Sequence, residues 1–190
     1  IFPRDFSPTE GLITPQEKPY RDEVCLNGYW ELQCVPVPSS WNGGTGIAPE
    51  LPAPQADKWE TVKIKIPSAI NVNDWGRGSN VGEGTRNPYT PSSVYYPSYP
   101  DNWKHTRMGW LRKNFRVPAG WNGKRLLLHF EAVAGDCVVL VNGKEVCHNF
   151  DSHLPFNADI SDYVNRDADN ELLVGVRHTK LFDKSHPVYT

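Results

Sequence analysis

The chain has 190 residues and a formal net charge of −2, and 38% of its residues are hydrophobic. This length suits one medium-sized domain with a single core. A nearly balanced charge provides no clustered basic surface, so nucleic acid is not an expected partner. The sequence contains no apolar run long enough to cross a bilayer, so a membrane is not an expected partner either.

The balance of residue types favours short strands joined by turns. Seven Trp, eight Tyr and seven Phe accompany 17 Pro and 15 Gly. Aromatic residues are enriched in strands, whereas Pro and Gly interrupt regular elements and build turns. Aromatic rings near loops also suit sugar ligands, but most such rings pack into a core or a loop. Carbohydrate binding therefore needs support from other features.

The first sixty residues are expected to hold one strand between two irregular segments. Residues 1–23 mix Pro, charged and isolated apolar residues, which indicates an extended lead-in. The sequence LNGYWEL, Leu26 to Leu32, is predicted to form the first strand. Residues 35–57 contain five Pro and a Gly-Gly pair, so they are predicted to form a long loop.

The next stretch predicts a half-buried strand and then the least regular part of the chain. In WETVKIKIPSAI, Trp59 to Ile70, apolar and polar residues alternate until Pro67 ends the strand. Residues 71–108 combine many Gly, Pro, Asn and Ser with two Trp and four Tyr. Irregular segments of this length are usually functional or disordered, and the aromatic content argues against disorder.

The middle of the chain is predicted to form two strands and a hairpin. The strands are GWLRKNFRVP, Gly109 to Pro118, and KRLLLHFEAV, Lys124 to Val133. The hairpin is VVLVNGKEV with Asn142-Gly143 at its tip, because Asn-Gly readily adopts the positive φ values of a two-residue type I′ turn. A strict two-residue turn places Cys147 opposite Val138 and on the other face from Cys137.

The last third of the chain is predicted to hold one turn of helix and one strand. In HLPFNADISDYV, Asp159 or Ser161 can cap a single helical turn. NELLVGVRH, Asn170 to His178, is predicted to form the last strand. Together these segments give seven or eight short strands with almost no helix, which predicts an all-β sandwich. Residues 24–190 would then form one domain after the lead-in.

The cysteine and histidine residues give no reason to expect a metal or another cofactor. The four Cys residues have no CxxC spacing, and no His is placed to complete a zinc site. The hairpin register argues against a disulfide between Cys137 and Cys147. A disulfide between Cys25 and Cys34 is geometrically open, and small buried thiols are the alternative. The compartment stays undecided, and a secreted or periplasmic location is favoured only if a signal peptide was removed.

Five motifs in a fixed order carry a resemblance to a known family. They are LNGYWEL, KWETVKIKIPSAI, GWLRKNFRVPAGWNGKRLLLHFEAV, VVLVNGKEVCHNFDSHLPFNADISDYV and NELLVGVRH. Residues 24–178 resemble the N-terminal sugar-binding domain of glycoside hydrolase family 2, which includes β-galactosidases, β-glucuronidases and β-mannosidases. The resemblance implies a jelly-roll β-sandwich that is galactose-binding-domain-like. In a whole enzyme of this family an immunoglobulin-like domain and a catalytic (β/α)₈ barrel would follow.

The resemblance places catalysis outside these 190 residues. Retaining glycoside hydrolysis uses two carboxyl groups about 5 to 5.5 Å apart. In the family both are Glu residues of the barrel, and one of them lies in an Asn-Glu pair. A barrel alone needs about 250 residues, so none fits here beside the sandwich. Asn170-Glu171 begins a predicted strand and is assigned a structural role, so no catalytic residue is predicted in this chain.

Two segments are candidates for lending side chains to a neighbouring active site. One is the aromatic segment before Gly109, and the other is the tail after His178. Their rings can stack on sugar C–H surfaces, and their Asp and Arg side chains can hydrogen-bond to hydroxyl groups. The candidate substrate contacts are Asp74, Trp75, Arg77, Tyr95, Tyr96, Trp103 and Asp183, with Lys180 and His186 also in the tail. The alternative is that these residues only pack the loop or a domain boundary.

Three functions are open on these observations. The first is a non-catalytic N-terminal domain of a retaining β-glycosidase that hydrolyses O-glycosidic bonds. Its partners would be a β-glycoside, the immunoglobulin-like and barrel domains of the same enzyme, and a second copy of the chain in a homo-oligomer. The second function is a free-standing carbohydrate-binding module, and the third is a purely structural interaction domain. The ordered motifs and the missing catalytic pair favour the first.

Overall fold

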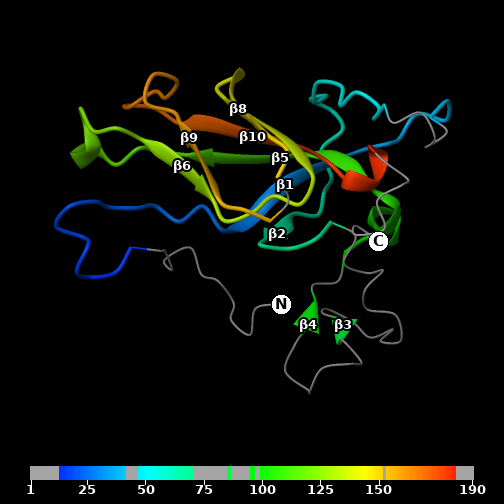
Figure 1. Ribbon diagram of the computed structural model, residues 1–190, viewed down its shortest axis with the longest axis horizontal. Helices are drawn as coiled ribbons and strands as arrows, with labels where there is room; N and C mark the ends of the chain where they lie inside the picture. The colour runs from blue at the N-terminus through cyan, green and yellow to red at the C-terminus, as the bar shows by residue number, and fades with distance from the viewer. Residues whose placement is uncertain are drawn as a thin grey trace. The chain divides into compact units, whose positions relative to one another are not determined.

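A computed structural model describes residues 13–41, 47–70, 85–86, 95–96, 99–151 and 153–182 (Figure 1). These residues form short strands and 3-10 turns and contain no α-helix, which confirms an all-β fold. Of the helices in these ranges, none is long and apolar enough to span a membrane. The chain divides into two compact units, a smaller one of Ile1–Trp30 and Val62–His105 and a larger one of Glu31–Thr61 and Thr106–Thr190.

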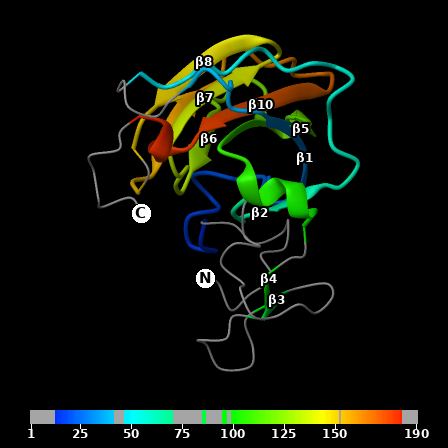
Figure 2. The ribbon, with the colours of Figure 1, turned by 90° about the vertical axis from the view of Figure 1, so that its right-hand side faces the viewer.

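The larger unit is built on an antiparallel sheet in the order β1-β5-β10-β7-β8 (Figures 1 and 2). The strands are β1 (Gly28–Val35), β5 (Met108–Phe115), β10 (Asn170–Arg177), β7 (Asp136–Val141) and β8 (Lys144–Asn149). Each overlaps a stretch from which a strand was predicted, but β1 continues three residues beyond its predicted end at Leu32, and β5 begins one residue before Gly109. Neighbours in this order are far apart in the chain, apart from the hairpin β7–β8.

One face of this sheet is a continuous row of apolar side chains. Leu32 pairs with Leu111, Leu111 with Val174, and Val174 with Val139, and all four are buried. Directly paired residues of adjacent strands project to the same face, so the row crosses the sheet from β1 to β7. Burying each of these side chains contributes on the order of 1.5–3 kcal/mol. A one-residue shift in the register of any of these strands would turn its side chain in this row to the other face of the sheet.

A second, two-stranded sheet belongs to the same unit. It pairs β6 (Leu127–Phe130) with β9 (Phe156–Asp159), and Phe130 stacks on Phe156 with ring centroids 4.8 Å apart. Strand β9 was not predicted, because only a capped helical turn was predicted from residues 153–164. That turn lies at residues 161–163, within the predicted stretch, where the backbone N–H of Tyr163 donates to the carbonyl of Ile160.

Asp159 caps that turn, as one of the two predicted capping residues. One carboxylate oxygen accepts hydrogen bonds from the hydroxyl group of Ser161 at 2.7 Å and from its backbone N–H at 3.1 Å. The other accepts from Arg125 Nε at 2.7 Å. The bond from the Ser161 hydroxyl, followed by that from Arg125, lowers the pKa of Asp159 to about 2.

This depressed pKa gives a pH dependence of fixed sign. The folded pKa lies below the ordinary value of 3.8, so the stability contributed by Asp159 is present above about pH 4 and is lost as pH falls towards 2. We expect Ser161→Ala to move the pKa of Asp159 upward and to flatten the stability profile between these two pH values. Carbon-detected NMR titration of the carboxyl group measures the shift. A wild-type carboxyl titrating near 3.8 would contradict the assignment.

The hairpin turn was predicted correctly, but the register beyond it was wrong. Asn142 and Gly143 have φ values of 50° and 77°, as a type I′ turn requires. An irregularity between Val139 and Leu140 inserts one extra residue on β8, so Cys147 lies opposite Val139 instead of Val138. Cys147 therefore shares a face with Cys137, contrary to the prediction. The argument from register against a disulfide fails, although both cysteines are free thiols in this structure.

We expect Gly143→Val to destabilise the protein by about 1–3 kcal/mol, which is the range for a residue held in an unfavourable backbone conformation. A Cβ at this position would meet no atom within 4 Å, so the cost is backbone strain alone. Gly143→Asn is the matched control, because Asn tolerates positive φ. Urea denaturation measures both variants. Equal midpoints for the Val variant and the parent would refute the assigned turn.

The smaller unit holds short elements. Strand β2 (Ile64–Ile66) pairs with the first three residues of β1, β3 (Thr85–Arg86) pairs with β4 (Tyr95–Tyr96), and a 3-10 helix, η2, spans Asp101–His105. The predicted strand at residues 59–70 is therefore wrong over its first five residues. Glu60 belongs to the larger unit, where its backbone N–H donates to the Leu32 carbonyl at 2.8 Å. Pro67 ends β2 as predicted, because proline has no N–H for the ladder.

Candidate functional site

Most of the predicted sugar contacts lie outside the described residues. These are Asp74, Trp75, Arg77 and Asp183, together with His186. For Tyr95 and Tyr96 the structure describes only the backbone, in strand β4, where Tyr96 pairs with Thr85 and Tyr95 pairs with Arg86. Lys180 lies in η4 (Thr179–Leu181). The assignment of these residues to a substrate pocket stays a prediction.

Trp103 is the predicted contact whose surroundings are clearest. Its side chain is 0% exposed, and its ring centroid lies 4.9 Å from that of Tyr99. The Tyr99 hydroxyl group accepts from the backbone N–H of Lys65 at 3.0 Å and donates to Ser68 Oγ at 3.2 Å. The indole Nε1 of Trp103 finds no hydrogen-bond partner among the described residues. In this structure Trp103 packs the core of the smaller unit, and sugar contact by its ring stays a prediction.

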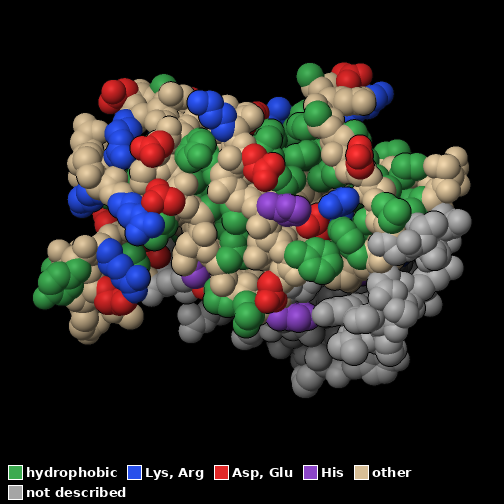
Figure 3. Space-filling model, turned by 45° about the horizontal axis from the view of Figure 1, so that its top comes forward, with side chains coloured by type: hydrophobic (Ala, Val, Ile, Leu, Met, Phe, Trp, Pro, Cys, Tyr) green, Lys and Arg blue, Asp and Glu red, His purple; other side chains and the backbone are tan. Residues whose placement is uncertain are grey.

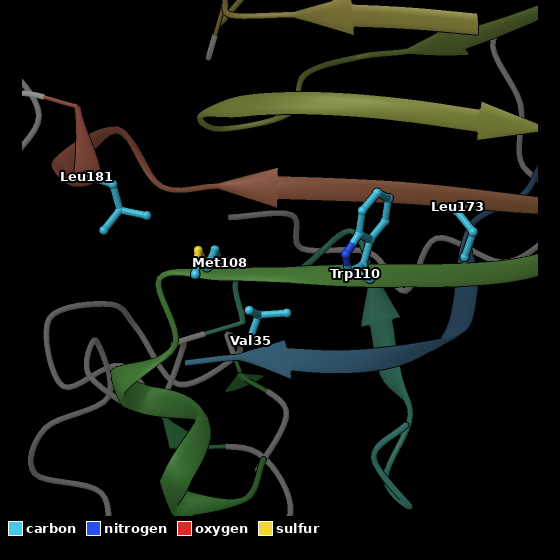
Figure 4. Close-up of a cluster of buried hydrophobic side chains, with 5 residues drawn as sticks. All are labelled: Val35, Met108, Trp110, Leu173 and Leu181. Carbon is cyan, nitrogen blue, oxygen red and sulfur yellow. The ribbon is translucent and has the colours of Figure 1, made fainter. Parts of the chain in front are cut away.

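The larger unit presents a second apolar face, on the side of the sheet opposite the Leu32 row. Its buried side chains come from β1, β5, β10 and the short 3-10 helix η4 (Figure 4). They are Val35, Met108, Trp110, Leu173 and Leu181. Leu51 of the predicted long loop and Trp59, where the next strand was predicted to begin, pack against them. We call residues 47–60 the covering segment.

Side chains of the sheet hold the covering segment by its backbone. Trp110 Nε1 donates to the carbonyl of Pro52 at 2.7 Å. The Gln33 amide donates to the carbonyl of Gln55 at 2.6 Å and accepts from its N–H at 2.8 Å. Arg177 Nη1 donates to the carbonyl of Pro49 at 2.9 Å. Each bond satisfies a polar group of a segment that has no ladder partners of its own.

Gly175 permits this close approach. It lies on β10 in direct register with Trp110. A Cβ at this position would lie 2.6 Å from Leu51 Cδ2 and 2.8 Å from the nearest ring carbon of Trp110. A larger residue would therefore push the covering segment or the indole ring away from the sheet. No pattern in the sequence indicates this role, because Gly175 lies in an ordinary strand stretch.

A buried carboxylate organises the edge of this face. Asp136 accepts from Arg177 Nε at 2.8 Å and Nη2 at 2.7 Å, and its other oxygen lies 2.5 Å from Nε2 of His148. The side chain of Asp136 is 7% exposed, while that of His148 is 54% exposed. The strand register brings these three side chains together. Arg177 pairs with Asp136, and His148 pairs with Val138, which lies two residues along β7 and projects to the same face as Asp136. We call Asp136, His148 and Arg177 the edge cluster.

A second charged group lies on the same face, nearer the start of β10. Arg112 Nε lies 2.5 Å from Glu31 Oε2, and Arg112 Nη1 lies 3.8 Å from Glu171 Oε2. The guanidinium also stacks over the ring of Trp59, with its carbon 4.1 Å from a ring centroid. Arg112 therefore ties the end of the covering segment to three strands. The carboxylates of Glu31 and Glu171 both lie close to the Arg112 guanidinium, so a structural role accounts for them.

The described thiols and imidazoles do not form a chemical centre. Burial raises the pKa of the Cys34 thiol to about 11 and that of Cys137 to about 12, so both stay protonated at neutral pH. A protonated thiol is a poor nucleophile and a poor metal ligand. Burial also lowers the pKa of His178, whose Nδ1 accepts from the backbone of Lys180. Within the described ranges, no three His, Cys, Asp or Glu side chains are grouped to hold a metal ion.

The family model for the sugar binding domain of glycosyl hydrolases family 2 matches residues 24–186. The chain therefore belongs to this family, and the resemblance carried by its five motifs is confirmed. It is similar to the β-glucuronidase of Felis catus, with 26% identity over 160 residues, or 81% of this chain and 20% of that protein. It is also similar to the β-galactosidase of Thermoanaerobacter pseudethanolicus, with 37% identity over 57 residues, or 30% of this chain and 8% of that protein.

Solved structures show a related fold. A β-glucuronidase from an uncultured Clostridium sp. superposes with a TM-score of 0.52 at 24% identity, covering 80% of this chain and 21% of that one. The β-glucuronidase of Ruminococcus gnavus in complex with C6-substituted uronic isofagomine gives a TM-score of 0.51 at 21% identity, with the same coverage. The chain thus spans about a fifth or less of the length of each of these four proteins.

Proposed function

We propose that this chain is the N-terminal, non-catalytic sugar-binding domain of a retaining β-glycosidase. In the whole enzyme it would help to shape the substrate pocket and to hold the other domains in place. The observation that carries the proposal is the family match over residues 24–186, combined with coverage of only about a fifth of the relatives. Most of the length of these relatives therefore lies outside the matched domain, and their catalytic residues can lie there.

The arrangement of the larger unit supports the finer fold assignment within this proposal. A jelly-roll sandwich, which is galactose-binding-domain-like, needs two antiparallel sheets whose inner faces are apolar. The larger unit has two antiparallel sheets, and the main sheet buries the row from Leu32 to Val139. The smaller sheet contributes the buried side chains of Leu128 and Ala158.

The surroundings of the Asn-Glu pair support a non-catalytic chain. Asn170 is 1% exposed, and its amide donates to the carbonyls of Asn165 and Ala168 and accepts from the backbone N–H of Asn165. It also accepts from the side chain of Asn142, whose own oxygen accepts from the backbone N–H of Glu171. This network joins the hairpin turn to the start of β10, so a structural requirement explains Asn170, and Glu171 takes part through its backbone N–H.

The substrate in this proposal is a β-linked glycoside. The names β-glucuronidase and β-galactosidase among the relatives both denote such activity. The residues proposed to reach the sugar are those of the aromatic segment and the tail. They are Asp74, Trp75, Arg77, Tyr95, Tyr96, Trp103 and Asp183. Their aromatic, acidic and cationic side chains suit sugar C–H faces and hydroxyl groups.

Assays on the 190-residue chain and on the longer polypeptide of its gene test the proposal. We expect the longer polypeptide to hydrolyse a p-nitrophenyl β-glycoside of galactose, glucuronic acid or mannose, and the chain alone to hydrolyse none. Isothermal titration of the chain alone with the three free sugars should give no heat. Measurable binding by the chain alone would favour a free-standing module instead. A longer polypeptide without glycosidase activity would favour a purely structural domain.

A further inference from the structure

The tripeptide Asn-Gly-Lys occurs twice in the chain, beginning at Asn122 and at Asn142. At both places the Asn-Gly pair forms the centre of a tight turn. Asn122 has φ and ψ values of −56° and 134°, and Gly123 has a φ value of 72°. The backbone N–H of Lys124 donates to the carbonyl of Trp121 at 3.0 Å, as in a type II turn. The two sites therefore share their local sequence and differ in what surrounds them.

The side chain of Asn142 is held by three hydrogen bonds. Its Nδ2 donates to the carbonyl of Tyr163 and to Oδ1 of Asn170, both at 2.8 Å. Its Oδ1 accepts from the backbone N–H of Glu171 at 3.0 Å. A carboxylate at this position would lose both N–H donors and would place an oxygen atom against two other oxygen atoms. The fold therefore restrains this amide and disfavours its conversion to an acid.

The side chain of Asn122 is in the opposite situation. Asn122 and Gly123 are both exposed. Within the described ranges, the Asn122 side chain has no hydrogen-bond partner, and the backbone N–H of Gly123 has no acceptor. Glycine also has no Cβ to hinder an approach to its own nitrogen. The amide carbon of Asn122 and the nitrogen that follows it are thus free to react with each other in water.

We propose that Asn122 is a site of spontaneous deamidation in the folded chain, and that the fold protects Asn142. The backbone nitrogen of Gly123 gives up its proton to water and attacks Cγ of Asn122. The N–Cγ bond forms, the Cγ–Nδ2 bond breaks, and Nδ2 leaves as ammonia after taking protons from water. Water then opens the cyclic imide at one of its two carbonyl carbons, which yields aspartate or isoaspartate. The reaction needs only water, and the inference is independent of the proposed function.

The isoaspartate product would disturb a clasp around this turn. Arg166 Nη1 donates to the carbonyl of Trp121 at 2.9 Å, and its Nη2 donates to the carbonyl of Lys124 at 3.0 Å. One guanidinium thus joins the two ends of the turn. Isoaspartate inserts its Cβ into the main chain between these two carbonyl groups, so the rigid guanidinium fork no longer matches their separation. We therefore expect the modified turn to lose at least one of the two bonds.

Both products also change the charge of the surface. Acidic and basic side chains are mixed over the face that Figure 3 shows, in keeping with a nearly balanced charge. One added carboxylate takes the formal net charge from −2 to −3. Ion-exchange chromatography therefore separates the modified chain from the parent.

Ageing the folded chain in mildly alkaline buffer and mapping its peptides tests the proposal without a mutation. Cleavage after lysine separates residues 114–124 from residues 125–144, and each peptide contains one Asn-Gly pair. We expect Asn122 to convert at least about tenfold faster than Asn142, because the hydrogen bonds of Asn142 must open before it can react. In urea the two rates should be about equal, since the tripeptide is the same. If the ratio in the folded chain is no larger than the ratio in urea, the proposal is overturned.

Asn122→Gln is the matched control for the effect on the turn. Glutamine keeps the amide, but its longer side chain must close a six-membered ring, which is slower. We expect the aged parent to unfold at a lower urea concentration than the fresh parent, and the aged variant to unfold where the fresh variant does. Isoaspartate at position 122 with an unchanged midpoint would overturn the disturbed clasp. An aged parent without modification at Asn122 would overturn the whole proposal.

Discussion

Gly135→Ala is expected to lower the free energy of unfolding by about 3 kcal/mol or more, from backbone strain and steric overlap together. Gly135 has a φ value of 122°, which L residues rarely adopt. A Cβ there would lie 2.2 Å from the carbonyl oxygen of Arg177. Because that atom belongs to the backbone of β10, it cannot turn aside as a side chain does. Either the turn before β7 or the end of β10 must move.

Gly120→Ala is the matched control for this substitution. A Cβ at Gly120 would meet no atom within 4 Å, and its φ value is not positive. We expect this variant to unfold at the same urea concentration as the parent or slightly above it, since Ala restricts the unfolded chain. Equilibrium denaturation of both variants measures the difference. Coincident curves for Gly135→Ala and Gly120→Ala would contradict the close packing of the turn against β10.

Asp136→Ala should destabilise the protein by about 3–5 kcal/mol, the range for removing one partner of a buried ion pair. The side chains of Asp136 and Arg177 are 7% and 19% exposed, so Arg177 would keep its charge with little access to water. The bond from Arg177 to the Pro49 carbonyl would remain, but a carbonyl cannot balance the charge. We also expect the end of the covering segment to loosen, because Arg177 connects it to the sheet.

An exposed ion pair provides the control for this second substitution. Asp169 pairs with Arg116, and their side chains are 66% and 72% exposed. Asp169→Ala should leave the melting temperature unchanged, because exposed pairs contribute little to stability. Calorimetry measures the melting temperatures of Asp136→Ala and Asp169→Ala. The melting temperature of His148→Gln tests the contribution of the imidazole separately. If Asp136→Ala melts at the parent temperature, the edge cluster does not stabilise the fold.

The features that the sequence predicts well depend on neighbouring residues. The turn at Asn142-Gly143 was predicted because an Asn-Gly pair favours positive φ without any distant contact. Strand β5 was predicted from the alternation of residues 110–117, which Lys113 only interrupts, and β10 from the apolar residues of its own stretch. The family was predicted because several motifs in a fixed order carry more information than any one of them.

The features that escaped prediction depend on distant partners. The extra residue on β8 is Val146, and nothing in its neighbours distinguishes it from a regular strand residue. Asp136 meets Arg177 only because β7 pairs with β10, and no local pattern states that pairing. The strand predicted from Trp59 was too long because Trp59 stacks under Arg112, a contact with a different strand. The proposed sugar contacts rest on residue type alone, since their segments carry no periodic pattern.

The side-chain hydrogen bonds that attach the covering segment to the sheet go to backbone atoms of the segment. Trp110, Gln33 and Arg177 bond to backbone atoms of Pro52, Gln55 and Pro49, and every residue type except proline supplies both a carbonyl and an N–H. Substitutions in the segment would therefore leave most of these attachments in place. Substitutions of the three sheet residues would remove them. In relatives that share this attachment, we expect the segment to diverge faster than the sheet positions that hold it.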